Sequence, residues 1–349
     1  MNKFMIAGVL LLVACGSPSD QSDTVSVTGS DTGSVAGSVT VPSSAASSST
    51  TINTVDNTVD DTVIDTTTST NTSTTVPCDQ IDPTITNHVF ATYPNISDRF
   101  TSFDLYLPAG CGPFPVLVWV HGGAWVGGDK ANPEAFDRAA YAFSLGYALA
   151  STNYRLANQF GKGTWPDYPN DVADAIAHIV DNADRLRLDA ERISLLGHSA
   201  GGHTVAIVSA DRSYMTNRGL NDDTIDCVIA NDTEGYRLED RETAYPLAIV
   251  NAFGTDPAVL ADASPSTRIE REGAPSTRYL IVTRGSERRQ AVASEFVDLV
   301  VAAGGDARLL VAGDYSHEDV NRVLGESGET ILTPGVSEFL RECLTPSGR

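Results

Sequence analysis

The sequence is poor in basic residues. Its 349 residues include 23 Lys and Arg against 45 Asp and Glu, for a formal net charge of -22. A surface with this charge repels phosphate, so the composition argues against nucleic acid as a partner. It does not by itself select a cationic substrate, because a spread acidic surface more often serves solubility.

Residues 16–77 lack the residue types that build a hydrophobic core. This stretch has no aromatic residue and no Lys or Arg, and consists almost entirely of Ser, Thr, Asp, Val, Gly and Asn. Such a segment cannot bury enough apolar surface to offset the entropy lost on ordering. We therefore predict a disordered, extended tether.

The N-terminus has an apolar run that is too short to cross a bilayer as a helix. The first residues, MNKFMIAGVLLLVAC, carry one Lys before this run and predict a signal peptide over residues 1–14. The four residues ending in Cys15 resemble a bacterial lipobox, which implies cleavage before Cys15 and acylation there. We expect an exported protein anchored to the membrane by lipid, with residues 15–77 as tether and residues 78–349 as the folded domain. An ordinary signal peptide with an incidental cysteine is the alternative.

Cysteine is scarce, and no two of the five cysteines are close in sequence. This spacing gives no sign of a zinc site. Besides Cys15, the chain has an even set that permits two disulfides in an exported protein. Of the three pairings, we favour Cys78–Cys111 and Cys227–Cys343.

From about residue 78, strand and helix signals alternate. The β-rich runs are Phe103–Leu107, Val116–Val120, Tyr147–Tyr154, Ile193–Leu196, Val228–Ala230, Leu247–Val250, Tyr279–Thr283 and Ala307–Val311. Helical patterns lie between them, for example over residues 133–146, 169–186 and 290–305. This order predicts an α/β fold with a mostly parallel eight-stranded sheet and helices on both faces.

Ser199 lies in Gly197-His198-Ser199-Ala200-Gly201, directly after a predicted strand and before a predicted helix. Gly-x-Ser-x-Gly in that context is typical of a nucleophile elbow, a strained turn that exposes the serine hydroxyl. Chemistry in such sheets gathers at the carboxyl ends of the strands. Ser199 is therefore the candidate nucleophile.

A second glycine-rich turn, VWVHGGAWVGGD, follows an earlier strand. Glycines let backbone N–H groups approach a substrate oxygen closely. We expect Gly122 and Gly123, together with the amide of Ala200, to form an oxyanion hole.

A serine hydroxyl needs a base to become a good nucleophile. Of the six histidines, His317 follows the last predicted strand, which is where the base falls in the chain order Ser, acid, His. His198 and His203 flank Ser199 too closely in sequence to face it, and we interpret His121 as organising its turn. We expect structural or solvated roles for His88 and His178.

The acid is expected between Ser199 and His317, in the loop after the penultimate strand. That loop, RGSERR, has no Asp, and Glu287 is its one carboxylate. A Glu can orient an imidazole as an Asp does, so we predict Glu287 as the acid. Asp256 is the alternative and Asp314 a weaker one.

Five segments, VHGGAW, TNYRLA, WPDYPNDVADAI, GHSAGGH and SHEDV, resemble in this order the α/β-hydrolase esterases. The likeness is greatest to the hormone-sensitive-lipase-like and feruloyl or acetylxylan esterase-like branches. It implies Ser199 as nucleophile, His317 as base and an oxyanion hole at Gly122, Gly123 and Ala200. Members of the family usually carry Asp in the loop where this chain has Glu287 and Arg288.

The resemblance implies acyl transfer on short-chain or small aromatic esters outside the cytoplasm, with no metal or organic cofactor. A peptidase or amidase of the same fold is one alternative. A binding module that keeps the fold without catalysis is another. The sequence does not indicate the oligomeric state.

Overall fold

The computed structural model describes residues 84–239 and 246–344. They belong to one compact unit, Thr72–Arg349. Cys15 and its lipidation, the predicted tether over residues 15–77, the boundary at residue 78 and Cys78 itself all lie outside the described residues.

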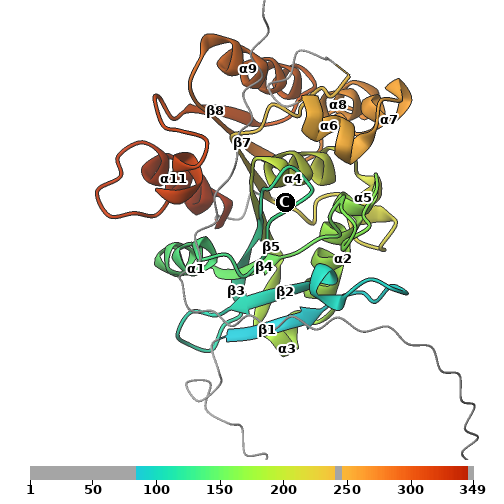
Figure 1. Ribbon diagram of the computed structural model, residues 1–349. Helices are drawn as coiled ribbons and strands as arrows, with labels where there is room; N and C mark the ends of the chain where they lie inside the picture. Colours follow the sequence, from blue (N-terminus) through green and yellow to red (C-terminus); the bar gives the residue numbers. More distant parts are fainter. Residues whose placement is uncertain (1–83, 240–245, 345–349) are drawn as a thin grey trace, which may run out of the picture. The chain divides into compact units, whose positions relative to one another are not determined.

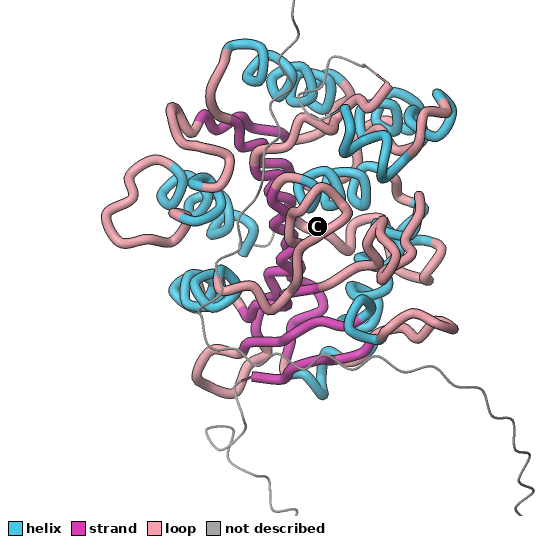
Figure 2. The backbone as a smooth tube through the Cα atoms, viewed as in Figure 1, coloured by secondary structure: helices cyan, strands magenta, loops and turns pink. Residues whose placement is uncertain are grey.

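The centre of this unit is an eight-stranded sheet in the order β1-β2-β4-β3-β5-β6-β7-β8. β1 and β2 pair antiparallel, as do β2 and β4, and every other neighbouring pair is parallel. The strands form a continuous twisted band through the molecule (Figure 2). The predicted fold class, a mostly parallel eight-stranded α/β sheet, is confirmed.

The elements alternate along the chain. The strands are β1 (Thr84–Val89), β2 (Ser102–Tyr106), β3 (Phe114–Val120), β4 (Ala148–Thr152), β5 (Leu188–His198), β6 (Cys227–Asn231), β7 (Arg278–Thr283) and β8 (Ala307–Val311). The helices are α1 (Glu134–Ser144), α2 (Asp167–Asp181), α3 (Ala183–Leu186), α4 (Ala200–Ala210), α5 (Ser213–Thr216), α6 (Pro246–Phe253), α7 (Pro257–Asp262), α8 (Pro265–Glu272), α9 (Glu287–Ala302), α10 (Asp319–Arg322) and α11 (Leu332–Leu344), with a short 3-10 helix, η2, at Asp98–Thr101.

Each face of the sheet has its own core. Alternate residues of β3 show this division: Val116 and Val118 join one apolar cluster, whereas Leu117 and Trp119 join the other. Helices α2, α4 and α9 pack into the first cluster, and α1 and α11 into the second. In Figure 1, α1 and α11 lie on the left of the sheet and α2 and α4 on its right. Because both faces are covered, the central strands β3 and β6 are buried along almost their whole length.

Two features of the sheet differ from the prediction. The apolar run Leu247–Val250, predicted as a strand, lies in helix α6. The missing strand is supplied by β1, Thr84–Val89, at the edge of the sheet. A run of four apolar residues fits a strand or a helix equally well, whereas Pro246 at the start of α6 is a helix signal.

A disulfide joins Cys227, the first residue of β6, to Cys343 in α11. This predicted pairing is confirmed. Cys111 is also disulfide-bonded, and its predicted partner Cys78 lies outside the described residues. The Cys227–Cys343 bridge closes a span of 116 residues and fastens the last helix to the sheet.

Removing this bridge with the double change Cys227→Ala and Cys343→Ala should lower the free energy of unfolding by about 2–5 kcal/mol. The closed loop is long, so the unfolded chain regains much conformational freedom when the bond is absent. Urea unfolding followed by circular dichroism measures the change. An unchanged unfolding midpoint would show that the bridge does not constrain the unfolded chain.

None of the helices within residues 84–239 and 246–344 is both long and apolar enough to cross a membrane.

Candidate active site

Ser199 occupies a strained corner between β5 and α4. Its backbone has φ 57° and ψ -118°, a conformation that residues other than glycine seldom adopt. The backbone N–H of Ser199 donates to the Asn231 carbonyl at 2.9 Å, which ties the corner to the end of β6. This geometry is that of a nucleophile elbow.

The glycines of the elbow are required by close packing. A Cβ on Gly197 would lie 2.2 Å from the Gly201 carbonyl oxygen, and one on Gly201 would lie 2.1 Å from the Val120 carbonyl oxygen. Real Cβ atoms do not approach backbone oxygens so closely. The Gly-x-Ser-x-Gly pattern thus lets α4 begin directly against β3 and β5.

His317, in the loop between β8 and α10, reaches the serine. Its Nε2 is 2.9 Å from Ser199 Oγ. Its Nδ1 is 2.6 Å from Oδ2 of Asp232, in the loop after β6. Since Asp232 is buried and accepts at Nδ1, the His317 tautomer carries its proton on Nδ1, and Nε2 is left to accept from the serine hydroxyl.

The carboxylate beside His317 is therefore Asp232, and the prediction of Glu287 is wrong. Glu287 begins helix α9 and is exposed. A carboxylate at this position interacts favourably with the positive end of the helix dipole. Asp256 caps α7 by accepting from the Ala258 N–H at 2.9 Å. Asp314 is exposed in a turn, so none of these three carboxylates takes the position beside the imidazole.

Asp232 was missed although the sequence holds a signal for it. It comes directly after β6, at the carboxyl end of a central strand, where parallel sheets gather their functional groups. The predicted acid, Glu287, instead follows β7, one strand further along the chain. The loop after β7 contributes Arg284, whose Nε donates to Asp232 Oδ2 at 2.7 Å.

The remaining histidines have other partners. His198 Nε2 donates to the His317 carbonyl at 2.8 Å, and His203 Nε2 donates to the Ala263 carbonyl at 2.8 Å. His121 stacks on Tyr154 with ring centroids 4.6 Å apart. His88 and His178 contact each other through their Nε2 atoms at 3.1 Å. Burial, and secondarily the neighbouring His317, lowers the pKa of His198 to about 3.

The residues predicted for the oxyanion hole lie around the serine. Gly123 and Ala200 line the same pocket as Ser199. Gly122 packs against the elbow, since a Cβ there would lie 3.1 Å from Ser199 Cβ. Ala200 is the first residue of α4, so its N–H has no acceptor within the helix.

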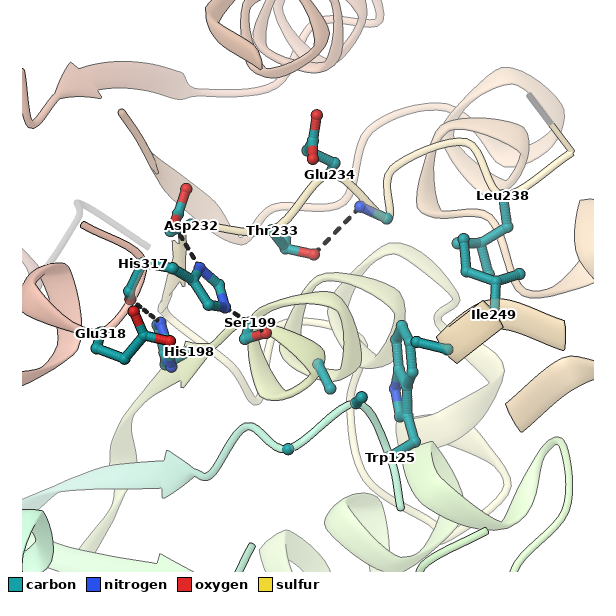
Figure 3. A pocket seen from close by; sticks show the side chains of 15 residues that line it. Trp125, His198, Ser199, Asp232, Thr233, Glu234, Leu238, Ile249, His317 and Glu318 are labelled. Atoms are coloured by element: carbon teal, nitrogen blue, oxygen red, sulfur yellow. Dashed lines mark hydrogen bonds and ion pairs between the residues drawn. The ribbon is translucent and has the colours of Figure 1, made fainter. Parts of the chain in front are cut away.

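The pocket has a volume of about 360 Å³. Ser199 and His317 lie at one end of it, and an apolar wall lies at the other (Figure 3). That wall consists of Trp125, Leu238, Ala248 and Ile249. A small apolar group next to a reactive hydroxyl fits this shape.

Among the residues the structure describes, the one group with a potential metal-binding arrangement is His198, Asp232 and His317. Their ligand atoms lie within 4.8 Å of one another. Asp232 already accepts from two guanidinium groups, and His317 Nε2 accepts from the Ser199 hydroxyl. A cation there would meet two positive charges, so the donor set does not fit a metal.

Solved structures share this fold. A truncated carbohydrate esterase from gut microbiota aligns with TM-score 0.59 and 17% identity, covering 76% of this chain and 97% of that one. Esterase B from Lactobacillus rhamnosis aligns with TM-score 0.60 and 16% identity, covering 74% and 84%. At these identities the likeness concerns the fold alone, and it is the α/β-hydrolase fold.

Curated relatives match part of the chain. Esterase LipC of Mycobacterium tuberculosis is 31% identical over 175 residues, which are 47% of this chain and 42% of that protein. A probable isoprenylcysteine alpha-carbonyl methylesterase of Arabidopsis thaliana is 33% identical over 121 residues, 33% of this chain and 26% of that protein. The chain thus spans less than half the length of these relatives.

The family model BD-FAE matches residues 103–294, more than half of the chain. The matched stretch includes Ser199 and Asp232 and ends before His317. With the α/β-hydrolase sheet, the elbow and the esterase relatives in agreement, the chain belongs to the BD-FAE family.

Proposed function

We propose that the protein is a serine carboxylic-ester hydrolase that works through an acyl-enzyme. The observation that carries this proposal is the continuous hydrogen-bonded series Ser199–His317–Asp232, with distances of 2.9 and 2.6 Å. Nucleophile, base and orienting acid come from three distant segments and meet at one pocket. This geometry meets the requirements for nucleophilic acyl transfer.

In the first half-reaction, Ser199 Oγ attacks the ester carbonyl carbon while its proton passes to His317 Nε2. The carbonyl oxygen becomes an oxyanion, and we infer that N–H groups of the predicted oxyanion hole, Gly122, Gly123 and Ala200, donate to it. One such donor stabilises the transition state by about 3 kcal/mol. Collapse of the tetrahedral intermediate breaks the bond to the alcohol oxygen, and the His317 imidazolium returns its proton to that oxygen.

In the second half-reaction, water replaces the alcohol. His317 takes a proton from the water as its oxygen attacks the acyl carbon, and then returns the proton to Ser199 Oγ as the acid leaves. Asp232 keeps the imidazole in the productive tautomer throughout. The chain's own residues are sufficient for every step.

The pocket walls support a proposal about the substrate class. Trp125, Leu238 and Ile249 give an apolar surface in a cavity of about 360 Å³, which favours a short acyl chain or a small aromatic ring. A long chain would extend beyond this volume. We infer short-chain or small aromatic esters as substrates.

A panel of p-nitrophenyl esters with acyl chains of two to twelve carbons tests this proposal. The expected result is turnover that is fastest for the short chains and falls for the long ones. A matched p-nitroanilide separates esterase from amidase activity. A folded protein that turns over none of these compounds would instead be a binding module.

We also propose that the enzyme acts outside the cytoplasm, held to the membrane by lipid on Cys15. The lipobox-like Leu12–Cys15 supports this location. Cys15→Ala should shift the protein from the membrane fraction to the soluble exported fraction, whereas Cys111→Ala should leave it in the membrane fraction. Membrane retention of the Cys15→Ala protein would contradict lipid anchoring.

A further inference from the structure

The carboxylate that orients His317 is held by two arginines. Arg284 Nε donates to Asp232 Oδ2 at 2.7 Å, and Arg289 Nη2 donates to Oδ1 at 2.6 Å. His317 donates to Oδ2 at 2.6 Å, so this one oxygen serves both the imidazole and Arg284. The Asp232 side chain is fully buried.

Glu234 belongs to the same cluster of charged side chains. Arg289 also binds Glu234 through Nη1, and Arg288 Nη2 binds the other Glu234 oxygen at 2.8 Å. Arg289 therefore bridges Asp232 and Glu234. The two guanidinium groups on Asp232 oppose the attraction that this carboxylate exerts on a proton at the neighbouring imidazole.

We propose that Arg284 and Arg289 are positioning residues that fix Asp232 in its contact with His317 and place fixed positive charge beside that pair. The proposal rests on the acyl-transfer function above. Arg284 stands in the loop after β7, and Asp232 stands in the loop after β6.

The other groups around His317 are consistent with this proposal. From β5, the His198 ring lies 4.6 Å from the His317 ring, and its lowered pKa of about 3 keeps it uncharged over the working range. From α1, the buried guanidinium of Arg138 adds positive potential near His198. Glu318, beside His317, is exposed and screened by solvent.

Asp232 itself stays ionised in this arrangement. Burial would raise its pKa, but hydrogen bonds from His317 and Arg289 and the charge of Arg289 together lower it to about 2. Asp232 therefore accepts from His317 as a carboxylate.

Arg284→Gln tests the proposal with little disturbance, because Asp232 keeps Arg289 and His317 as partners. The midpoint of the acid limb of kcat/KM for a short ester should move up by about one pH unit. At pH values below the midpoints of both proteins, kcat/KM of the variant should then be about tenfold lower than that of the native enzyme. Arg284→Lys keeps the charge and should leave the midpoint near that of the native enzyme, even if the rate falls. Arg308→Gln, whose guanidinium pairs with Glu342 in an exposed position, is the control for a distant charge change.

A measurement that does not require ester hydrolysis distinguishes failure of this proposal from failure of the proposed function. NMR titration of the His317 ring follows imidazole protonation directly, with or without ester hydrolysis. The ring signal should titrate at higher pH in Arg284→Gln, or in Arg284→Met should the glutamine variant fail to fold. An unchanged titration midpoint, or an equal shift in Arg284→Lys, would overturn the proposal.

Discussion

Replacing Ser199 by alanine should lower kcat/KM for a short ester by about 10⁴- to 10⁶-fold. The change removes the hydroxyl oxygen that lies 2.9 Å from His317 Nε2, so no acyl-enzyme can form on this residue. Binding should be little affected, because the apolar wall at Trp125 and Leu238 is untouched. Steady-state kinetics with purified protein measure the loss.

The matched control is Ser286→Ala. Ser286 precedes α9, is exposed and makes no capping hydrogen bond through its side chain. Its replacement should leave kcat/KM unchanged within about twofold. Equal rates for Ser199→Ala and the native enzyme would remove Ser199 from the mechanism.

Asp232→Asn should lower kcat/KM by about 10⁴-fold, equivalent to about 5.5 kcal/mol. An asparagine amide facing His317 Nδ1 favours the wrong imidazole tautomer, and Nε2 then no longer accepts the serine proton. The change also leaves Arg284 and Arg289 without their shared counter-charge. A loss of folding stability of about 3–5 kcal/mol should accompany the loss of rate.

The two effects of Asp232→Asn are separated by measuring rates on folded protein, identified by circular dichroism well below the unfolding midpoint. Glu287→Gln and Asp256→Asn are the controls, since both residues are exposed and the contact with the imidazole is made by Asp232. Each should retain activity within about twofold. A full rate in Asp232→Asn beside a large loss in Glu287→Gln would restore the assignment made from the sequence.

The nucleophile and base could be placed from the sequence because their signals are local. Ser199 lies in a five-residue pattern whose glycines the packing requires. His317 follows the last strand, and chain order alone singles it out from the other histidines. Neither inference depends on knowing which loops lie next to each other in space.

The acid could not be placed this way because its position depends on tertiary structure. Asp232 and Glu287 both follow strands of the same sheet, and the sequence alone does not say which loop reaches His317. The resemblance to the α/β-hydrolase esterases favoured the loop after β7, where this chain carries Arg284. The ion pairs among Asp232, Glu234 and Arg289 likewise join separate segments, so no pattern in one segment predicts them.

The fold was predictable where apolar runs are long and bounded, and ambiguous where they are short. The buried strands β3 and β7 match their predicted runs to within two residues, whereas β5 contains the run Ile193–Leu196 but begins at Leu188. The edge strand β1 is half exposed and lacks a strong apolar signal. The four apolar residues of α6 carry no periodicity long enough to separate helix from strand.

The most direct test of the catalytic centre is covalent trapping with a fluorophosphonate followed by peptide mass spectrometry. The expected result is one phosphonyl adduct on the peptide that contains Ser199, absent from Ser199→Ala and strongly slowed in Asp232→Asn. An adduct on any other residue, or ester hydrolysis that continues without an adduct on Ser199, would contradict the proposed centre.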